Sequence, residues 1–187
     1  MYYNTSVTDR QTPRVNCEFI FGGGDVDRNS LLESLKACMG EAQRRGDMGA
    51  SAVIEAAGAD SSRVLRAVGI LTDGRTFFET LLTYLGEKAE HPAGFYSTAN
   101  ISAQTWSQMQ DRTHNVSKVT VFRAALALKL DYLDAAILME KAGYTFRSND
   151  RMDMIMTCML RAGIYDHGLV DKLLDESNLP TLFSSLD

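Results

Sequence analysis

Residues that cap helices recur along this chain, each followed by a short apolar segment, and they constrain the fold more than any other feature. Residues 30–33 (Ser-Leu-Leu-Glu) and 76–79 (Thr-Phe-Phe-Glu) are capping boxes, in which a hydroxyl and a carboxylate bind backbone N–H groups at a helix start. Single capping residues precede four further segments: Ser102, Ser117, Asp131 and Asp166. Apolar residues recur at helical spacing behind these caps, so the sequence predicts an all-α protein.

The expected helices are short and follow one another closely. They cover about residues 30–45, 50–57, 62–70, 77–90, 95–99, 103–112, 118–130, 132–142, 149–162 and 167–177. Residues 15–21 are a candidate for one short strand that the glycines at 22–24 would end. Pro92 and Gly94 are expected to break the helix that begins at residue 77 and to shorten the next one.

Three regions follow from this pattern. Residues 1–28 are predicted to be an arm or linker, either disordered or ordered by a partner. Residues 29–74 are expected to form a small helical N-terminal region, either a domain of its own or an extension packed on the next one. Residues 75–187 are expected to form the main helical domain with two extra helices at its C-terminal end. A chain of 187 residues with 45% hydrophobic side chains is long enough to bury a core.

The charge and cysteine content narrow the class of protein. A formal net charge of −5 counts against strong nonspecific DNA binding, although it allows a local basic strip. Three widely spaced cysteines favour buried free thiols over disulfides or a zinc site. No apolar run approaches the ~20 residues of a membrane helix, and the first 14 residues have no apolar signal-peptide core. We therefore expect a cytoplasmic protein without membrane contact.

No group of residues follows a catalytic pattern. His91, His114 and His167 stand far apart and lack metal-ligand spacing. The glycines at 22–24 lack the Gly-Lys-Ser/Thr ending of a phosphate loop, and no pair of carboxylates stands out for acid–base work. The methionines between residues 152 and 159 follow helical spacing, which favours core packing over an adaptable binding surface. We expect neither enzymatic activity nor a cofactor nor a metal.

Residues 99–102 (Ala-Asn-Ile-Ser) have the pattern of a tight turn between two helices: a small residue, a residue that tolerates positive φ, an apolar anchor and a cap. Trp106 and Met109 follow on one apolar face, and residues 116–130 continue the pattern without a gap. The stretch of about residues 77–144 resembles the phage repressor–Cro helix-turn-helix family, and more closely some uncharacterised bacterial helix-turn-helix-like domains. This resemblance implies a five-helix domain whose helix after Ser102 enters the DNA major groove.

Two residues depart from the family pattern. Tyr96 stands where the family keeps a small alanine at a close helix crossing, so we expect a wider crossing or a displaced helix. Pro92 stands where many members carry a glutamine that bonds a DNA phosphate, and proline has no N–H to donate.

The resemblance also implies a set of DNA contacts. The base-contacting residues would be Gln104, Ser107 and Gln108, and the phosphate-anchoring residues would be Arg112, Ser117 and Lys118. Glutamine can bond adenine through two hydrogen bonds, but two cations neutralise few phosphates, so a homodimer is expected. The implied function is sequence-specific binding of double-stranded DNA in transcriptional regulation. The alternative is a protein-interaction or oligomerisation module that kept the fold without binding DNA, which the acidic net charge, Tyr96 and Pro92 favour.

Overall fold

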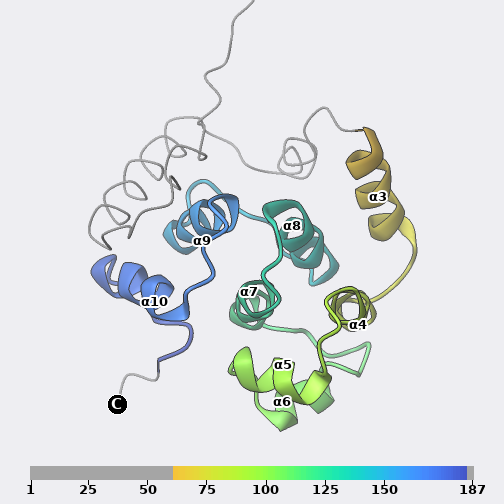
Figure 1. Cartoon of the computed structure of the whole chain (residues 1–187), viewed down its shortest axis with the longest axis horizontal. Helices are drawn as coiled ribbons and strands as arrows, with labels where there is room; N and C mark the ends of the chain where they lie inside the picture. The colour runs from red at the N-terminus through yellow and green to blue at the C-terminus, as the bar shows by residue number, and fades with distance from the viewer. Residues whose placement is uncertain (1–60, 185–187) are drawn as a thin grey trace, which may run out of the picture.

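The computed structural model describes residues 61–184, and within this part of the chain every regular element is a helix (Figure 1). The helices are α3 Ser61–Thr72, α4 Phe77–Glu87, α5 Pro92–Thr98, α6 Ala103–Gln108, α7 Lys118–Ala127, α8 Tyr132–Lys141, α9 Arg151–Arg161 and α10 His167–Glu176. The all-α prediction is confirmed for these residues. The predicted arm at 1–28, the strand at 15–21 and the helices before residue 58 lie outside the described residues. Between residues 61 and 184 no helix combines the length and the apolar character that crossing a membrane requires.

The predicted capping residues stand at the helix starts. Thr76 and Glu79 form the expected reciprocal capping box at α4. Each of four other helices begins after the predicted cap, whose side chain accepts a backbone N–H from the first turn: Ser102, Ser117, Asp131 and Asp166. Local hydrogen-bonding chemistry therefore sets where these helices begin.

Several helix boundaries differ from the prediction by a few residues, and two of them have a clear local cause. The helix that begins at residue 77 ends before Pro92, as predicted, but α5 begins at Pro92 rather than at Phe95. The proline occupies the first turn of α5, where its missing N–H costs nothing, and His91 caps that helix through Nδ1. Helix α6 ends at Gln108 rather than near Arg112, because the chain turns there and the Asp111 carboxylate binds the N–H of Thr113. The prediction was wrong at both points.

Helix α7 lies at the centre of the described fold, with α4, α5, α8 and α9 around it (Figure 1). Its residues from 120 to 126 are buried except for Arg123, and α8 is buried along most of its length. Ala124 and Ala125 on α7 and Ala135 and Ala136 on α8 are all nearly inaccessible, and their small size allows these helices to pack closely. The core is therefore built on the α7–α8 pair.

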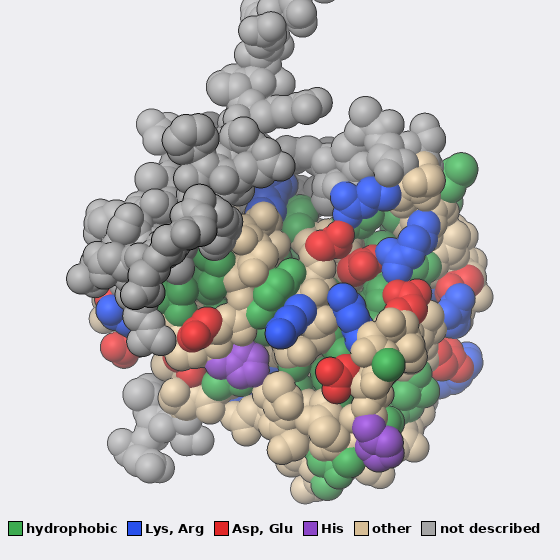
Figure 2. Space-filling model, in the orientation of Figure 1, with side chains coloured by type: hydrophobic (Ala, Val, Ile, Leu, Met, Phe, Trp, Pro, Cys, Tyr) green, Lys and Arg blue, Asp and Glu red, His purple; other side chains and the backbone are tan. Residues whose placement is uncertain are grey.

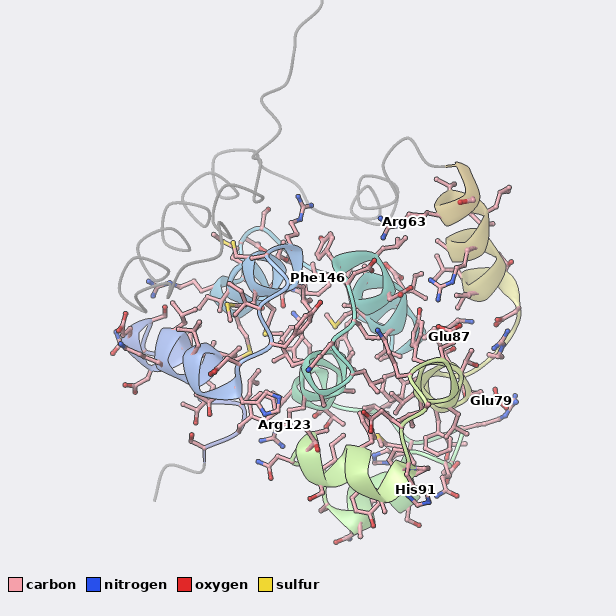
Figure 3. All side chains as sticks on the ribbon, in the orientation of Figure 1. Arg63, Glu79, Glu87, His91, Arg123 and Phe146 are labelled. Carbon is pink, nitrogen blue, oxygen red and sulfur yellow. The ribbon has the colours of Figure 1, made fainter. Side chains whose placement is uncertain are left out.

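Helix α9 packs on α8 and completes the core. Met154, Met156 and Met159 are buried, so the methionine-rich stretch is core packing, as predicted. Cys158, the one cysteine among residues 61–184, is buried, as predicted. The ring of Phe146, in the loop before α9, lies between α8 and α9 (Figure 3) and contacts Phe122 of α7.

Helix α3, from the predicted N-terminal region of residues 29–74, packs on the outer side of α8, which agrees with the expected alternative of an extension packed on the next domain. Its apolar side chains, including the buried Ala67, contact Leu133 and Ile137 of α8. Two arginines add ion pairs: Arg63 bonds Asp131, and Arg66 bonds both Asp134 and Glu87. Helix α3 is thus in direct contact with the predicted main domain.

Thr157 of α9 provides a test of the core. Its side chain is buried, and its hydroxyl has no hydrogen-bond partner among residues 61–184. Because valine has the same shape without the hydroxyl, Thr157→Val is expected to raise the free energy of unfolding by about 1 kcal/mol, measured by urea denaturation. The matched control is Thr80→Val, which removes an equally buried hydroxyl that donates to the Thr76 carbonyl, and which should be destabilising. Equal losses in the two variants would contradict the prediction.

Candidate nucleic-acid interface

The turn between α5 and α6 has the geometry that its sequence predicts. Asn100 has φ of +50°, which confirms the expected left-handed residue. The N–H of Ile101 donates to the carbonyl of Tyr96 at 2.8 Å and ends α5, while the Ile101 side chain is buried. Ser102 then caps α6 by accepting the N–H of Thr105 at 3.0 Å. The direction of α6 is therefore fixed by local bonds at both sides of the turn.

The inner face of α6 is apolar and packs on α4 and α5. The half-buried ring of Trp106 contacts Phe78 of α4 and Phe95 and Tyr96 of α5, with ring centroids 5.1, 5.7 and 5.7 Å apart. Met109, directly after α6, is buried. Tyr96, one of the departures from the family pattern, takes part in this aromatic cluster.

The outer face of α6 is polar and exposed. Gln104, Ser107 and Gln108 are all exposed, and their spacing of three and four residues places them on one side of the helix. The structure therefore brings the three predicted base-contacting residues together on one accessible surface.

Arg112 follows α6 and is engaged in an ion pair with α4. Its guanidinium lies 2.6 Å from the Glu79 carboxylate, which also accepts the backbone N–H of Thr76. The Thr76 N–H and, to a smaller extent, the Arg112 guanidinium lower the pKa of Glu79, so this carboxylate stays charged. Arg112 remains 68% exposed, and ion pairs between exposed side chains are weak. A stronger anionic partner can replace Glu79.

Lys118, at the start of α7, is held on the side of α9. Its ammonium contacts Asp153 and lies 3.5 Å from Asp150, and its side chain is only 20% exposed. Burial raises the pKa of Asp153, and the ion pair with Lys118 opposes that shift. Helices α6 and α9 lie on opposite sides of α7 (Figure 1), so Lys118 points away from the three polar residues on α6. Ser117, the neighbouring cap, is exposed.

The charges around these residues are mixed. Figure 2 shows Lys and Arg side chains interspersed with Asp and Glu over the face that it presents, and the surface over α5 and α6 is mostly uncharged in this view. The two predicted phosphate-anchoring cations, Arg112 and Lys118, both face carboxylates. These ion pairs limit the positive charge that Arg112 and Lys118 offer to a polyanion such as DNA.

Arg123 of α7 is a residue of this region that the sequence analysis missed. Its Nε donates to the carbonyl of Leu182, and its terminal nitrogen donates to the carbonyl of Asn100 at 3.1 Å. Asn100 in turn donates from Nδ2 to the carbonyl of Phe183 at 3.1 Å. Figure 3 shows Arg123 between α5 and the segment that follows α10. An arginine inside an otherwise Ala/Leu-rich helix was the sequence signal for such a contact.

The segment at residues 182–184 is held by Asp171 of α10. Its buried carboxylate accepts the backbone N–H groups of Leu182, Phe183 and Ser184 at 2.6 to 3.2 Å. The ring of His167 stacks on Phe183 with centroids 3.6 Å apart, and burial lowers the pKa of His167. The C-terminal segment is therefore attached both to α10 and, through Arg123, to the α5–α6 turn.

The described part of the chain is thus all-helical. Its helix α6 has an exposed polar face and packs with its other face on an aromatic cluster of α4 and α5. Comparison of the chain with protein-family models, with curated proteins and with solved structures finds no match. Among residues 61–184, no cluster of His, Cys, Asp and Glu side chains has an arrangement that could hold a metal ion.

Proposed function

We propose that α4 to α8 form a repressor–Cro-like helix-turn-helix domain and that α6 binds the major groove of double-stranded DNA in transcriptional regulation. The observation that carries this proposal is the two-sided character of α6. Trp106 and Met109 face the core, while Gln104, Ser107 and Gln108 are exposed directly after the left-handed turn at Asn100. A helix presented in this way can approach base edges with its first turns.

The chemistry of the exposed side chains fits base readout. A glutamine amide can donate to N7 and accept from N6 of adenine, and one such pair contributes about 1–3 kcal/mol of discrimination. Ser107 adds a hydroxyl between the two glutamines. The residues that anchor phosphates are Arg112, which leaves Glu79 to bind a phosphate, and the exposed Ser117. Lys118 supports the fold through Asp153 in this proposal. Because one cation per protomer anchors weakly, a homodimer on a two-fold site is the expected binding form.

A salt-titrated binding assay on a pool of random duplexes tests the proposal. Gln104→Ala should weaken binding to the selected sites by roughly 5- to 150-fold, the equivalent of about 1–3 kcal/mol. Arg112→Ala should lower affinity for all duplexes and reduce the slope of log K against log salt by about 1. The matched controls are Gln110→Ala, an exposed glutamine beyond α6, and Lys172→Ala, an exposed cation on α10. Undetectable duplex binding at low salt would remove the proposal.

A second candidate function is a protein-interaction or oligomerisation module without DNA binding. The observation that favours it is the pairing of both predicted anchoring cations with carboxylates in a chain of net charge −5. Such a surface suits a protein partner better than a polyanion. In the same assay this candidate predicts no duplex binding at low salt for wild type.

A further inference from the structure

A half-open pocket of about 480 Å³ lies against the α5–α6 turn. Side chains from three helices line it, including those of Tyr96, Ser97, Ser102, Thr105, Thr120 and Arg123. The lining combines one cation, several hydroxyls and an aromatic ring. Sites for small ligands are typically concave and contain a few convergent polar groups, as this pocket does.

Arg123 is the charged group of this pocket, and it has no ion-pair partner among residues 61–184. The described residues provide it with two neutral acceptors, the carbonyls of Leu182 and Asn100. A guanidinium carries five N–H donors, so three remain without a partner in this part of the chain. Burial lowers the pKa of Arg123, yet a guanidinium remains protonated in proteins. In this half-buried position the charge of the guanidinium is compensated by solvent or by an anion in the pocket, since the two carbonyl oxygens do so incompletely.

The nearest acidic group cannot supply that compensation in full. Among residues 61–184, Asp171 is the carboxylate that contributes to the electrostatic environment of Arg123, and its oxygens already accept three backbone N–H groups. A carboxylate saturated in this way has little capacity left for a guanidinium. The remaining N–H groups of Arg123 thus have no anionic partner among residues 61–184.

The hydroxyl groups of the pocket can donate to the same ligand. The oxygens of Ser102 and Thr105 lie 2.8 Å apart and share one hydrogen, so the other hydroxyl hydrogen is left over. Thr120 and Ser117 form a second pair of this kind at 2.8 Å. Hydroxyl and guanidinium donors together match the oxygens of a carboxylate or phosphate group.

We propose that this pocket binds a small anionic molecule through a carboxylate or phosphate group held by Arg123 and the Ser102–Thr105 hydroxyl pair. This inference does not require that the chain binds DNA. Because Arg123 also bonds the Asn100 carbonyl, a bound anion changes the bonding of the turn that directs α6. The pocket is therefore placed to make the presentation of α6 depend on a small molecule.

The test titrates the full chain with two probes, sodium phosphate and sodium benzoate, at constant ionic strength, and follows the backbone amide signals by NMR. We expect saturable shifts around residues 97–105 and 120–123, with a Kd on the order of millimolar for either probe. Ser97→Phe fills the pocket from an exposed position of α5 and should weaken binding at least ~10-fold, or about 1.4 kcal/mol. Thr98→Phe, at the adjacent exposed position outside the lining, is the matched control and should bind as wild type does.

Three results would overturn the inference. The first is linear, non-saturating shifts for both probes, and the second is binding that Ser97→Phe leaves unchanged. The third result comes from a further titration with a random duplex pool, which distinguishes a free phosphate ligand from the phosphates of the DNA backbone. If Ser97→Phe weakens duplex binding while neither small probe binds, the pocket contacts the DNA backbone and the small-molecule site is wrong. If the wild-type chain binds the small probes but no duplex, the proposed DNA-binding function is wrong and the small-molecule site stands.

Discussion

Replacing Lys118 with methionine is expected to lower the free energy of unfolding by about 3–5 kcal/mol, because it leaves a buried charge without a partner. The carboxylate of Asp153 is fully buried, and Lys118 is the cation that contacts it. The N–H of Arg147 donates to the other carboxylate oxygen at 2.9 Å but brings no compensating charge. Methionine keeps the volume and the flexible stem of lysine. Guanidinium chloride denaturation at pH 7 measures the loss.

The loss should shrink as the pH falls. Burial already raises the pKa of Asp153, and removing the ammonium raises it further. Between the ordinary pKa of an aspartate, about 3.9, and the higher native value, the folded variant binds a proton that the unfolded chain does not. Its stability relative to wild type therefore increases as the pH is lowered from 7 towards 4. A pH-independent difference between the two proteins would contradict this mechanism.

Two further variants separate charge from packing. Lys118→Met combined with Asp153→Asn removes the buried charge but keeps an acceptor for the Arg147 N–H, and should recover most of the loss at pH 7. Lys172→Met removes an exposed lysine of α10 that lies 4.0 Å from Glu176, and should cost less than about 1 kcal/mol. A double variant no more stable than Lys118→Met would assign the effect to lost packing instead.

The sequence predicted the local part of this fold well. Thr76 with Glu79, and Ser102 alone, cap their helices through bonds that span three residues, so a short sequence pattern contains all the partners. The same holds for the left-handed Asn100, because the turn needs a residue that tolerates positive φ. The resemblance to the helix-turn-helix pattern also placed Trp106 and Met109 against the core correctly.

The predicted boundaries of α5 and α6 were wrong, because nearby side chains compete there for backbone N–H groups. The apolar spacing allowed α6 to continue to Arg112, but the Asp111 carboxylate binds both the N–H and the hydroxyl of Thr113 and favours a turn. The helix after the break was expected to begin at Phe95, whereas the Nδ1 of His91 caps a helix that starts at Pro92. Both outcomes depend on side-chain geometry that residue type alone does not specify.

Contacts between distant segments were out of reach of the sequence. Lys118 was assigned to a phosphate from its position after α6, and the structure places Asp153 of α9 against it. The position of Arg123 within an Ala/Leu-rich helix signals a contact, but it does not identify the carbonyl of Leu182 as the partner, because a hydrogen bond between distant segments leaves no periodic pattern. The exposed face of α6 could therefore be predicted, but the electrostatic surroundings that decide its use could not.

Asp171→Asn is expected to release the C-terminal segment and to lower the free energy of unfolding by about 2–4 kcal/mol. The buried carboxylate of Asp171 accepts the N–H groups of three consecutive residues, 182 to 184. An asparagine side chain has one oxygen and a donor amide, which faces the same N–H groups and repels them. Leu182 is fully buried, so its release also exposes apolar surface. Urea denaturation measures the global loss, and amide hydrogen exchange at residues 182–184 measures the release.

The same substitution should change the α5–α6 turn, because the segment and the turn share their bonds. Release of residues 182–184 removes the Leu182 carbonyl from Arg123 and the Phe183 carbonyl from Asn100. We expect the NMR shifts of Asp171→Asn to extend to residues 100–102, some distance from α10. Asp175→Asn, on the exposed side of the same helix, is the matched control and should leave both the exchange rates and the turn signals unchanged. Shifts confined to α10 and the C-terminal segment would show that the segment does not support the turn that orients α6.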